Sequence, residues 1–130
     1  RKSLADAELK TKNNSDLNLV LALNYSARED IIEGIKKISK EIANNSISEQ
    51  DITSDVFNNY LSTADIPSPE LLIRTSGEIR ISNFLLWEIA YTELYFTDVF
   101  WPDFKREEFF NAIIDYQNRE RRFGMVSEQI

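Results

Sequence analysis

The sequence predicts an α/β fold in which a mainly parallel sheet is flanked by helices. Two observations support this prediction. Short apolar runs typical of strands alternate with segments whose apolar residues recur at helical spacing, and 42% of the 130 residues are hydrophobic. A chain of this size and composition can bury one core. Because strands that alternate with helices are typical of crossover units, neighbouring strands are expected to be mainly parallel.

Three apolar runs are expected to be strands, at residues 17–25, 70–75 and 93–97. The first, LNLVLALNY, is compact and contains few residues that break regular structure. A run of this length is also compatible with a helix. The second and third strands are predicted from the segments ELLIRT and ELYFT.

Two helices are expected between the first and second strands. Ser26 and Glu29 have the spacing of a capping box, and isoleucines then recur at helical spacing, which predicts a helix from Glu29 to Ala43. Thr53 is expected to cap a second, short helix.

Two further helices are expected later in the chain. One should run from Asn83 to Tyr91 and precede the third strand. The other should begin at an Asp103 cap and end near Gly124, a residue suited to a helix C-terminus. The apolar residues of this last helix are expected to face inward: Phe109, Phe110, Ile113, Ile114 and Tyr116.

The charge and composition exclude several classes of function. The net charge is -7, so a general nucleic-acid surface, which needs a basic stripe, is not expected. There is no cysteine, which excludes disulfides and thiolate nucleophiles, and there is no histidine. A bound metal would therefore be a hard ion such as Mg2+. No apolar stretch is long enough to span a membrane.

The segment RTSGEIRISNF combines two arginines with hydroxyl groups at the end of the second expected strand. Ligands of open parallel sheets bind beyond the carboxyl ends of the strands, which is where Arg74 lies. Gly77 allows a tight turn or a close backbone approach, and the free N–H groups of the next expected helix favour anions. Together with Arg80 and Ser82, these groups suit a phosphate or a diphosphate.

A structural explanation of the same residues is also possible, and composition alone favours it. Arg74 could pair with Glu78, Arg80 could cover a helix face with its aliphatic stem, and Ser82 could be only a helix cap. Glu93 could be a metal ligand or an ordinary surface acid.

Two other groups of residues have a strong structural explanation. A dense set of aromatic residues is expected in the core or in a subunit interface, where aromatic residues concentrate. Its members are Trp87, Tyr91, Tyr95, Phe96, Phe100 and Trp101. Arg119, Arg121 and Arg122 lie near the end of the last expected helix, where the helix dipole favours cations.

The sequence LLIRTSGEIRISNFLLWEIAYTELYFTDVFWPDF closely resembles the C-terminal signature of the cis-prenyltransferase family, above all its bacterial members that make undecaprenyl diphosphate. RKS, LALNYSAREDII and NRERRFG are also similar, so the resemblance covers nearly the whole chain. It implies a homodimeric, cytoplasmic enzyme that uses Mg2+ to condense isopentenyl diphosphate with farnesyl diphosphate. The product would be the lipid carrier for cell-wall sugars, delivered at the inner membrane surface.

The resemblance also implies roles for individual residues. Arg74, Arg80, Ile81 and Ser82 match positions that bind isopentenyl diphosphate, and Glu93 matches an acid that helps to organise Mg2+. These positions coincide with the phosphate site inferred from the residues alone.

This sequence departs from the family pattern in several places. Ile79 stands where many members have a histidine tied to the metal, NYSARE replaces NYGGRW, and RRFGM replaces RRFGG, which weakens the expectation of contact from the C-terminal tail. The family's catalytic aspartate belongs to an N-terminal segment similar to MDGNGRWA, which is absent here. We therefore expect residues 1–130 to be the C-terminal part of one incomplete domain, inactive alone and without a catalytic residue of its own.

The sequence is compatible with two alternatives to an enzyme. The first is a non-catalytic partner subunit of a cis-prenyltransferase, which need not keep the arginines, whereas this chain has them together with Ser82 and Glu93. The second is an unrelated acidic interaction domain, which the long signature disfavours.

Overall fold

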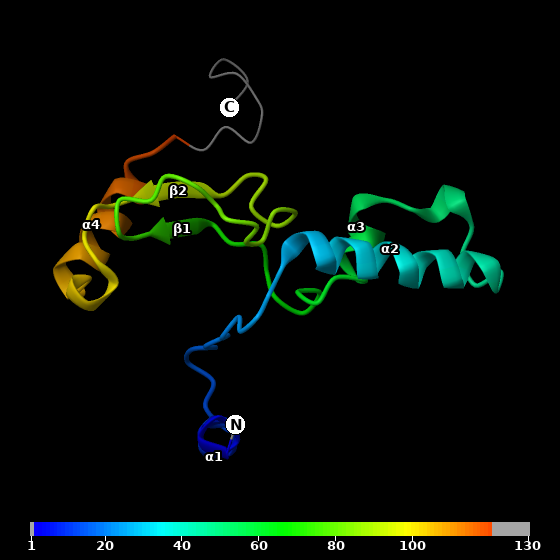
Figure 1. Cartoon of the computed structure of the whole chain (residues 1–130), viewed down its shortest axis with the longest axis horizontal. Coiled ribbons are helices and arrows are strands. Elements are labelled where there is room, and N and C mark those ends of the chain that lie inside the picture. The colour runs from blue at the N-terminus through cyan, green and yellow to red at the C-terminus, as the bar shows by residue number, and fades with distance from the viewer. Residues whose placement is uncertain (1, 121–130) are drawn as a thin grey trace.

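The computed structural model describes residues 2–120. Its elements, in chain order, are α1 (Lys2–Thr11), α2 (Ala27–Ala43), the 3-10 turn η1 (Glu49–Asp51), α3 (Ser54–Asn58), β1 (Leu71–Arg74), β2 (Glu93–Phe96), the 3-10 turn η2 (Trp101–Asp103) and α4 (Arg106–Gln117). In Figure 1 the two strands and α4 lie at one end of the molecule, α2 and α3 lie at the other, and α1 stands apart at the end of an extended segment. No helix within residues 2–120 is long and apolar enough to cross a membrane.

The sheet consists of β1 and β2, which are parallel as predicted, with Leu71 opposite Glu93 and Arg74 opposite Phe96. One further hydrogen bond continues the ladder beyond Arg74, where the Thr97 N–H donates to the Arg74 carbonyl at 3.0 Å. Helix α4 contacts β2 and buries Ala112 completely. The mixture of helices with a parallel strand pair confirms the α/β class.

Helix α2 confirms the isoleucine pattern and packs on Phe57 of α3 and on the turn that follows α3. A Cβ atom added to Gly34 would lie 3.2 Å from the Phe57 ring and 3.5 Å from Leu61, so the missing side chain allows the two helices to approach. The Lys37 ammonium donates to the Tyr60 carbonyl at 2.9 Å and closes the same contact. The predicted Thr53 cap is also confirmed, since its hydroxyl accepts the Val56 N–H at 3.2 Å.

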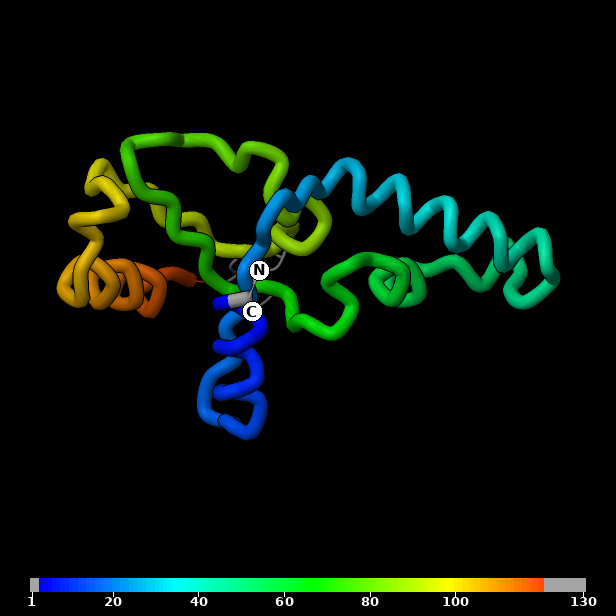
Figure 2. The backbone as a smooth tube through the Cα atoms, turned by 60° about the horizontal axis from the view of Figure 1, so that its bottom comes forward, coloured from blue at the N-terminus to red at the C-terminus, as the bar shows by residue number. Residues whose placement is uncertain are grey.

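The start of α2 differs from the prediction. Ser26 occupies the cap position, but it makes no capping hydrogen bond within its own helix. The side chain of Asn83, from the loop after β1, caps α2 instead: its Oδ1 atom accepts the Arg28 N–H at 3.0 Å, and its Nδ2 atom donates to the Ser26 hydroxyl at 2.8 Å. Figure 2 shows that loop reaching the beginning of α2.

Two predicted elements are wrong. Residues 17–25 do not form a strand, because no described segment pairs with their backbone. Residues 83–91 form a series of turns rather than a helix. The backbone φ angles of Ser82, Asn83 and Leu85 are 53°, 61° and 48°, and a right-handed helix cannot contain such residues.

The last helix begins later than predicted. Asp103 belongs to η2, Lys105 is the N-cap residue of α4, and the helix ends at Gln117. The predicted end at Gly124 lies outside the described residues. Three α4 side chains that were expected to face inward are 45–54% exposed, which corrects that expectation: Phe109, Phe110 and Ile114. Tyr91, Phe100 and Trp101, which were expected in the core or in a subunit interface, are 65–73% exposed and so lie outside the core of the described residues, while their place in an interface stays a prediction.

Candidate functional site

The loop that follows β1 is conformationally strained. Ser76 and Ser82 both have positive φ angles, of 72° and 53°, and this region costs an ordinary residue about 1–2 kcal/mol. The loop is tied to the chain after β2, since the N–H groups of Ser76 and Gly77 donate to the carbonyls of Val99 and Thr97, each at 2.9 Å. Strain of this kind concentrates at ligand sites, where the surrounding structure maintains it.

Gly77 forms the tight turn that the sequence predicted. Its φ angle is 68°, and an added Cβ atom would lie only 3.0 Å from the Asp98 carboxylate. A side chain at this position would therefore be strained and would also press on Asp98.

The two arginines of the loop have different partners. The Arg74 Nη1 atom donates to the Ser82 hydroxyl at 3.1 Å, so these two predicted site residues are brought together. Arg80 forms an ion pair with Glu78, whereas the alternative pair between Arg74 and Glu78 is not formed. The Arg80 side chain is 62% exposed, and an exposed ion pair contributes at most about 1 kcal/mol. An anionic ligand can therefore replace Glu78 as the partner of Arg80.

Arg74, Glu78 and Arg80 line a cavity of about 410 Å³ at the carboxyl end of β1, whereas Ser82 contacts Arg74 but is not among the lining residues. Its polar lining comes from Arg74, Thr75, Ser76, Glu78 and Arg80, and its apolar lining from Leu72, Ile73, Ile81 and Phe84. The predicted contribution from a helix N-terminus is absent, because residues 83–91 are not helical. The arrangement suits a small ligand with an anionic head and a short apolar tail.

Asn83, which lies between the cavity-lining residues Ile81 and Phe84, connects this loop to the start of α2, and the sequence prediction missed its role. Its backbone carbonyl accepts the Ala27 N–H at 3.1 Å, in addition to the two side-chain hydrogen bonds to α2. The sequence signal for this turn was the pair Ser82-Asn83, since asparagine tolerates a positive φ angle better than most residues do.

Glu93 does not lie with the arginines. It pairs with Leu71 at the start of the parallel ladder, whereas Arg74 is at the other end. Three residue steps along the strand, from Leu71 to Arg74, separate the two ends, which corresponds to about 10 Å. The expected site residues are therefore divided between the two ends of the strand pair.

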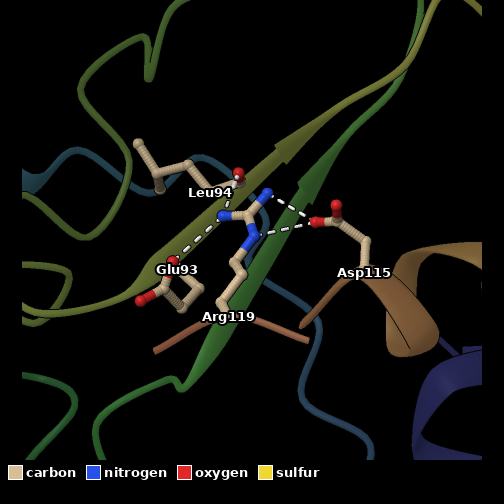
Figure 3. Close-up of polar contacts among 4 residues, drawn as sticks. All are labelled: Glu93, Leu94, Asp115 and Arg119. Atoms are coloured by element: carbon tan, nitrogen blue, oxygen red, sulfur yellow. Dashed lines mark hydrogen bonds and ion pairs between the residues drawn. The ribbon is translucent and has the colours of Figure 1, made fainter. Parts of the chain in front are cut away.

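Glu93 is instead bound by Arg119, as Figure 3 shows. The Arg119 Nη1 atom donates to Glu93 at 3.0 Å and to the Leu94 carbonyl at 2.9 Å, while its Nε atom donates to Asp115 at 2.8 Å. The hydrogen bond to Glu93, followed by that to Asp115, raises the pKa of the Arg119 guanidinium above its usual value. Arg119 therefore joins the end of α4 to the start of β2, a contact that the sequence did not indicate.

The described residues do not form a complete magnesium site. Within residues 2–120 there is no group of three acidic, histidine or cysteine side chains that could hold a metal ion. Ile79, at the position where the family often has a histidine, is 79% exposed and has no ligating atom.

Comparisons with known proteins identify the family to which the chain is similar. Residues 1–124 match the prenyltransferase family model described as undecaprenyl diphosphate synthase. The farnesyl-diphosphate-specific undecaprenyl-diphosphate synthase of Coxiella burnetii is 48% identical over 120 residues, which are 92% of this chain and 51% of that protein. The isoprenyl transferase of Porphyromonas gingivalis is 49% identical over 130 residues, which are 100% of this chain and 51% of that protein.

A solved structure has the same fold. Lavandulyl diphosphate synthase from Lavandula x intermedia, in complex with dimethylallyl diphosphate, matches with a TM-score of 0.88 and 38% identity over 95% of this chain and 53% of that chain. This chain thus spans about half the length of the relatives it matches. The family match and the identities both extend along nearly all of the chain, and the resemblance predicted from the arginine loop is confirmed. The chain belongs to the undecaprenyl diphosphate synthase family of prenyltransferases.

Proposed function

We propose that the protein carrying this chain condenses isopentenyl diphosphate with farnesyl diphosphate to give undecaprenyl diphosphate, the lipid carrier for cell-wall sugars, and that this chain binds isopentenyl diphosphate. The observation that carries the proposal is the cavity beyond β1, where two guanidinium groups stand beside an apolar wall. Support comes from the names of the relatives and from the solved relative, whose complex contains another five-carbon isoprenoid diphosphate.

The chemistry of the cavity matches the two parts of this substrate. Arg74, oriented by Ser82, and Arg80 can each donate charge-assisted hydrogen bonds to the diphosphate. Ile81 and Phe84 line the same cavity and offer apolar contacts to the five-carbon tail. The strained loop fixes these groups before the ligand arrives, which reduces the entropy cost of binding.

The proposal includes Mg2+, which would neutralise charge on a leaving diphosphate, with Glu93 as one ligand from this chain. Arg119 would have to release Glu93, and the remaining ligands would have to come from beyond the described residues. The proposal also includes a homodimer in the cytoplasm that delivers its lipid product at the inner membrane surface. Phe100 and Trp101 are 65% and 73% exposed and are among the aromatic residues that a subunit interface would bury.

The test is steady-state turnover of radiolabelled isopentenyl diphosphate by the protein that carries this chain. Arg80→Ala should raise the KM for isopentenyl diphosphate and lower turnover. A charge-assisted hydrogen bond contributes about 1.5–3 kcal/mol, so kcat/KM should fall about tenfold to hundredfold. Arg80→Lys should recover only part of the loss, because an ammonium group cannot form the bidentate hydrogen bonds that a guanidinium group forms with a phosphate.

Arg28→Ala is the matched control, because Arg28 is an exposed arginine on α2 outside the cavity. It should leave the kinetics unchanged. A purely structural role for Arg80 predicts the opposite pattern, with a lower melting temperature and normal kinetics in the folded fraction. That result would refute the assignment of Arg80 to the substrate.

A further inference from the structure

An acidic side chain lies among the groups that form the proposed anion site. Glu78 and Arg80 both line the cavity beyond β1, and they form an ion pair with each other. The Glu78 side chain is 36% exposed and the Arg80 side chain is 62% exposed, so both remain in contact with solvent. A carboxylate in such a cavity repels the anion that the guanidinium groups attract. The presence of Glu78 therefore affects how the site binds its ligand.

The atoms of the ion pair show how Glu78 affects Arg80. The Oε2 atom of Glu78 contacts the Nη2 atom of the guanidinium group. A guanidinium group can bind a phosphate through two parallel hydrogen bonds in two ways, either with Nε and Nη2 or with Nη1 and Nη2. Both arrangements use Nη2. A ligand that binds Arg80 in this bidentate manner must therefore displace Glu78.

Arg74 has a different kind of partner in the same loop. Its Nη1 atom donates to the hydroxyl of Ser82 at 3.1 Å. A hydroxyl group carries no charge and can rotate toward another partner, so it does not compete with an anion for the guanidinium group. Glu78 thus acts on one of the two arginines, and the effect of a change at Glu78 should depend on Arg80.

The ion pair is weak enough for a ligand to displace it reversibly. An exposed ion pair changes an equilibrium constant by at most about fivefold, because water and salt screen its charges. Glu78 and Arg80 are only two residues apart in the chain, so the carboxylate stays close to Arg80 after displacement and can return when the ligand leaves. The pair therefore weakens ligand binding without preventing it.

We propose that Glu78 is an internal competitor for Arg80 that limits how tightly this site binds a diphosphate. The inference rests on the proposed function, which supplies the diphosphate as the ligand. Glu78 pairs with Arg80 before the diphosphate binds, gives up the Nη2 atom when the diphosphate arrives, and pairs with Arg80 again when the diphosphate leaves. Glu78 is thus a residue that determines the affinity of the site, although it does not bind the ligand.

The test is the binding of inorganic diphosphate, without added metal, to the protein that carries this chain, measured by isothermal titration calorimetry. Glu78→Gln keeps the size of the side chain and removes its charge. It should lower the Kd for diphosphate about twofold to fivefold, because Arg80 no longer has to exchange an acidic partner. In an Arg80→Ala background the same substitution should change the Kd by less than about 1.5-fold, since only repulsion screened by water and salt remains.

Glu107→Gln is the matched control, because Glu107 is an exposed acid on α4 outside the cavity and its substitution changes the net charge equally. This variant should leave the Kd unchanged. If Glu78 instead holds Arg80 in place for the ligand, Glu78→Gln would weaken binding, and that result would overturn the proposal. An unchanged Kd, an equal gain in the Arg80→Ala background, or no binding of diphosphate to the wild type would also overturn it.

The proposed function is tested separately from this competition. Turnover of isopentenyl diphosphate decides the reaction, whereas the binding of inorganic diphosphate decides whether Glu78 competes for Arg80. If turnover were absent while Glu78→Gln still tightened diphosphate binding, the proposed function would fail and the role of Glu78 would stand.

Discussion

The contact between Asn83 and the start of α2 predicts a measurable change in stability, because this residue both caps α2 and occupies a left-handed conformation in the loop. Its Oδ1 atom caps α2 by accepting the Arg28 N–H, and the residue also holds a φ angle of 61° in the loop beside the cavity. Asn83→Ala would remove the cap, worth about 1 kcal/mol, and would place an ordinary residue in the left-handed region, at about 1–2 kcal/mol. The free energy of unfolding should therefore fall by about 2–3 kcal/mol.

Asn83→Asp separates the two contributions. An aspartate keeps the acceptor for the Arg28 N–H and tolerates the left-handed conformation, and its charge is favourable at a helix N-terminus. It loses only the hydrogen bond that Asn83 donates to Ser26. This variant should therefore unfold within about 0.5 kcal/mol of the wild type, because the charge offsets much of the lost bond.

The assay is urea unfolding followed by circular dichroism, combined with amide exchange of the first turn of α2. Asn13→Ala, at an exposed asparagine outside these contacts, is the control and should change little. The reasoning is refuted if Asn83→Ala costs less than about 0.5 kcal/mol, or if Asn83→Asp is as damaging as Asn83→Ala.

Two further predictions concern stability. Arg119→Ala should lower the free energy of unfolding by about 1–3 kcal/mol, because it leaves Glu93 and the Leu94 carbonyl without their donor. Thermal melts test this, and a melting temperature equal to that of Arg28→Ala would contradict it. Burial, assisted by the Glu88 and Asp30 carboxylates, raises the pKa of Tyr25 from 10.0 to about 12. The unfolded chain therefore ionises first, so the contribution of Tyr25 to stability is intact below pH 10 and is lost as the pH rises toward 12. Unfolding titrations across this range should show a smaller loss in Tyr25→Phe, and equal slopes in both proteins would argue against the shift.

Local sequence patterns were sufficient to predict the helices and strands that are stabilised mainly by local interactions or by strongly apolar side chains. The isoleucine spacing predicted α2, and the runs around residues 71–74 and 93–96 predicted a parallel strand pair. The arginine loop was also located correctly, because a strand end, a glycine and two guanidinium groups are adjacent in the chain. Family membership depended on the same continuous segment, which is why it could be predicted before any geometry was known.

The tertiary structure decided whatever depends on residues far apart in the chain. Residues 17–25 have the composition of a strand but no described partner, and composition cannot supply one. The expected helix after Ser82 does not form, because residues of this loop have positive φ angles and the loop is hydrogen-bonded to α2. Local helix propensity contains no information about hydrogen bonds to a distant helix. Asn83 reaches Ser26 across 57 residues and Arg119 reaches Glu93 across 26, so the cap of α2 and the true partner of Glu93 became visible only once the chain was folded.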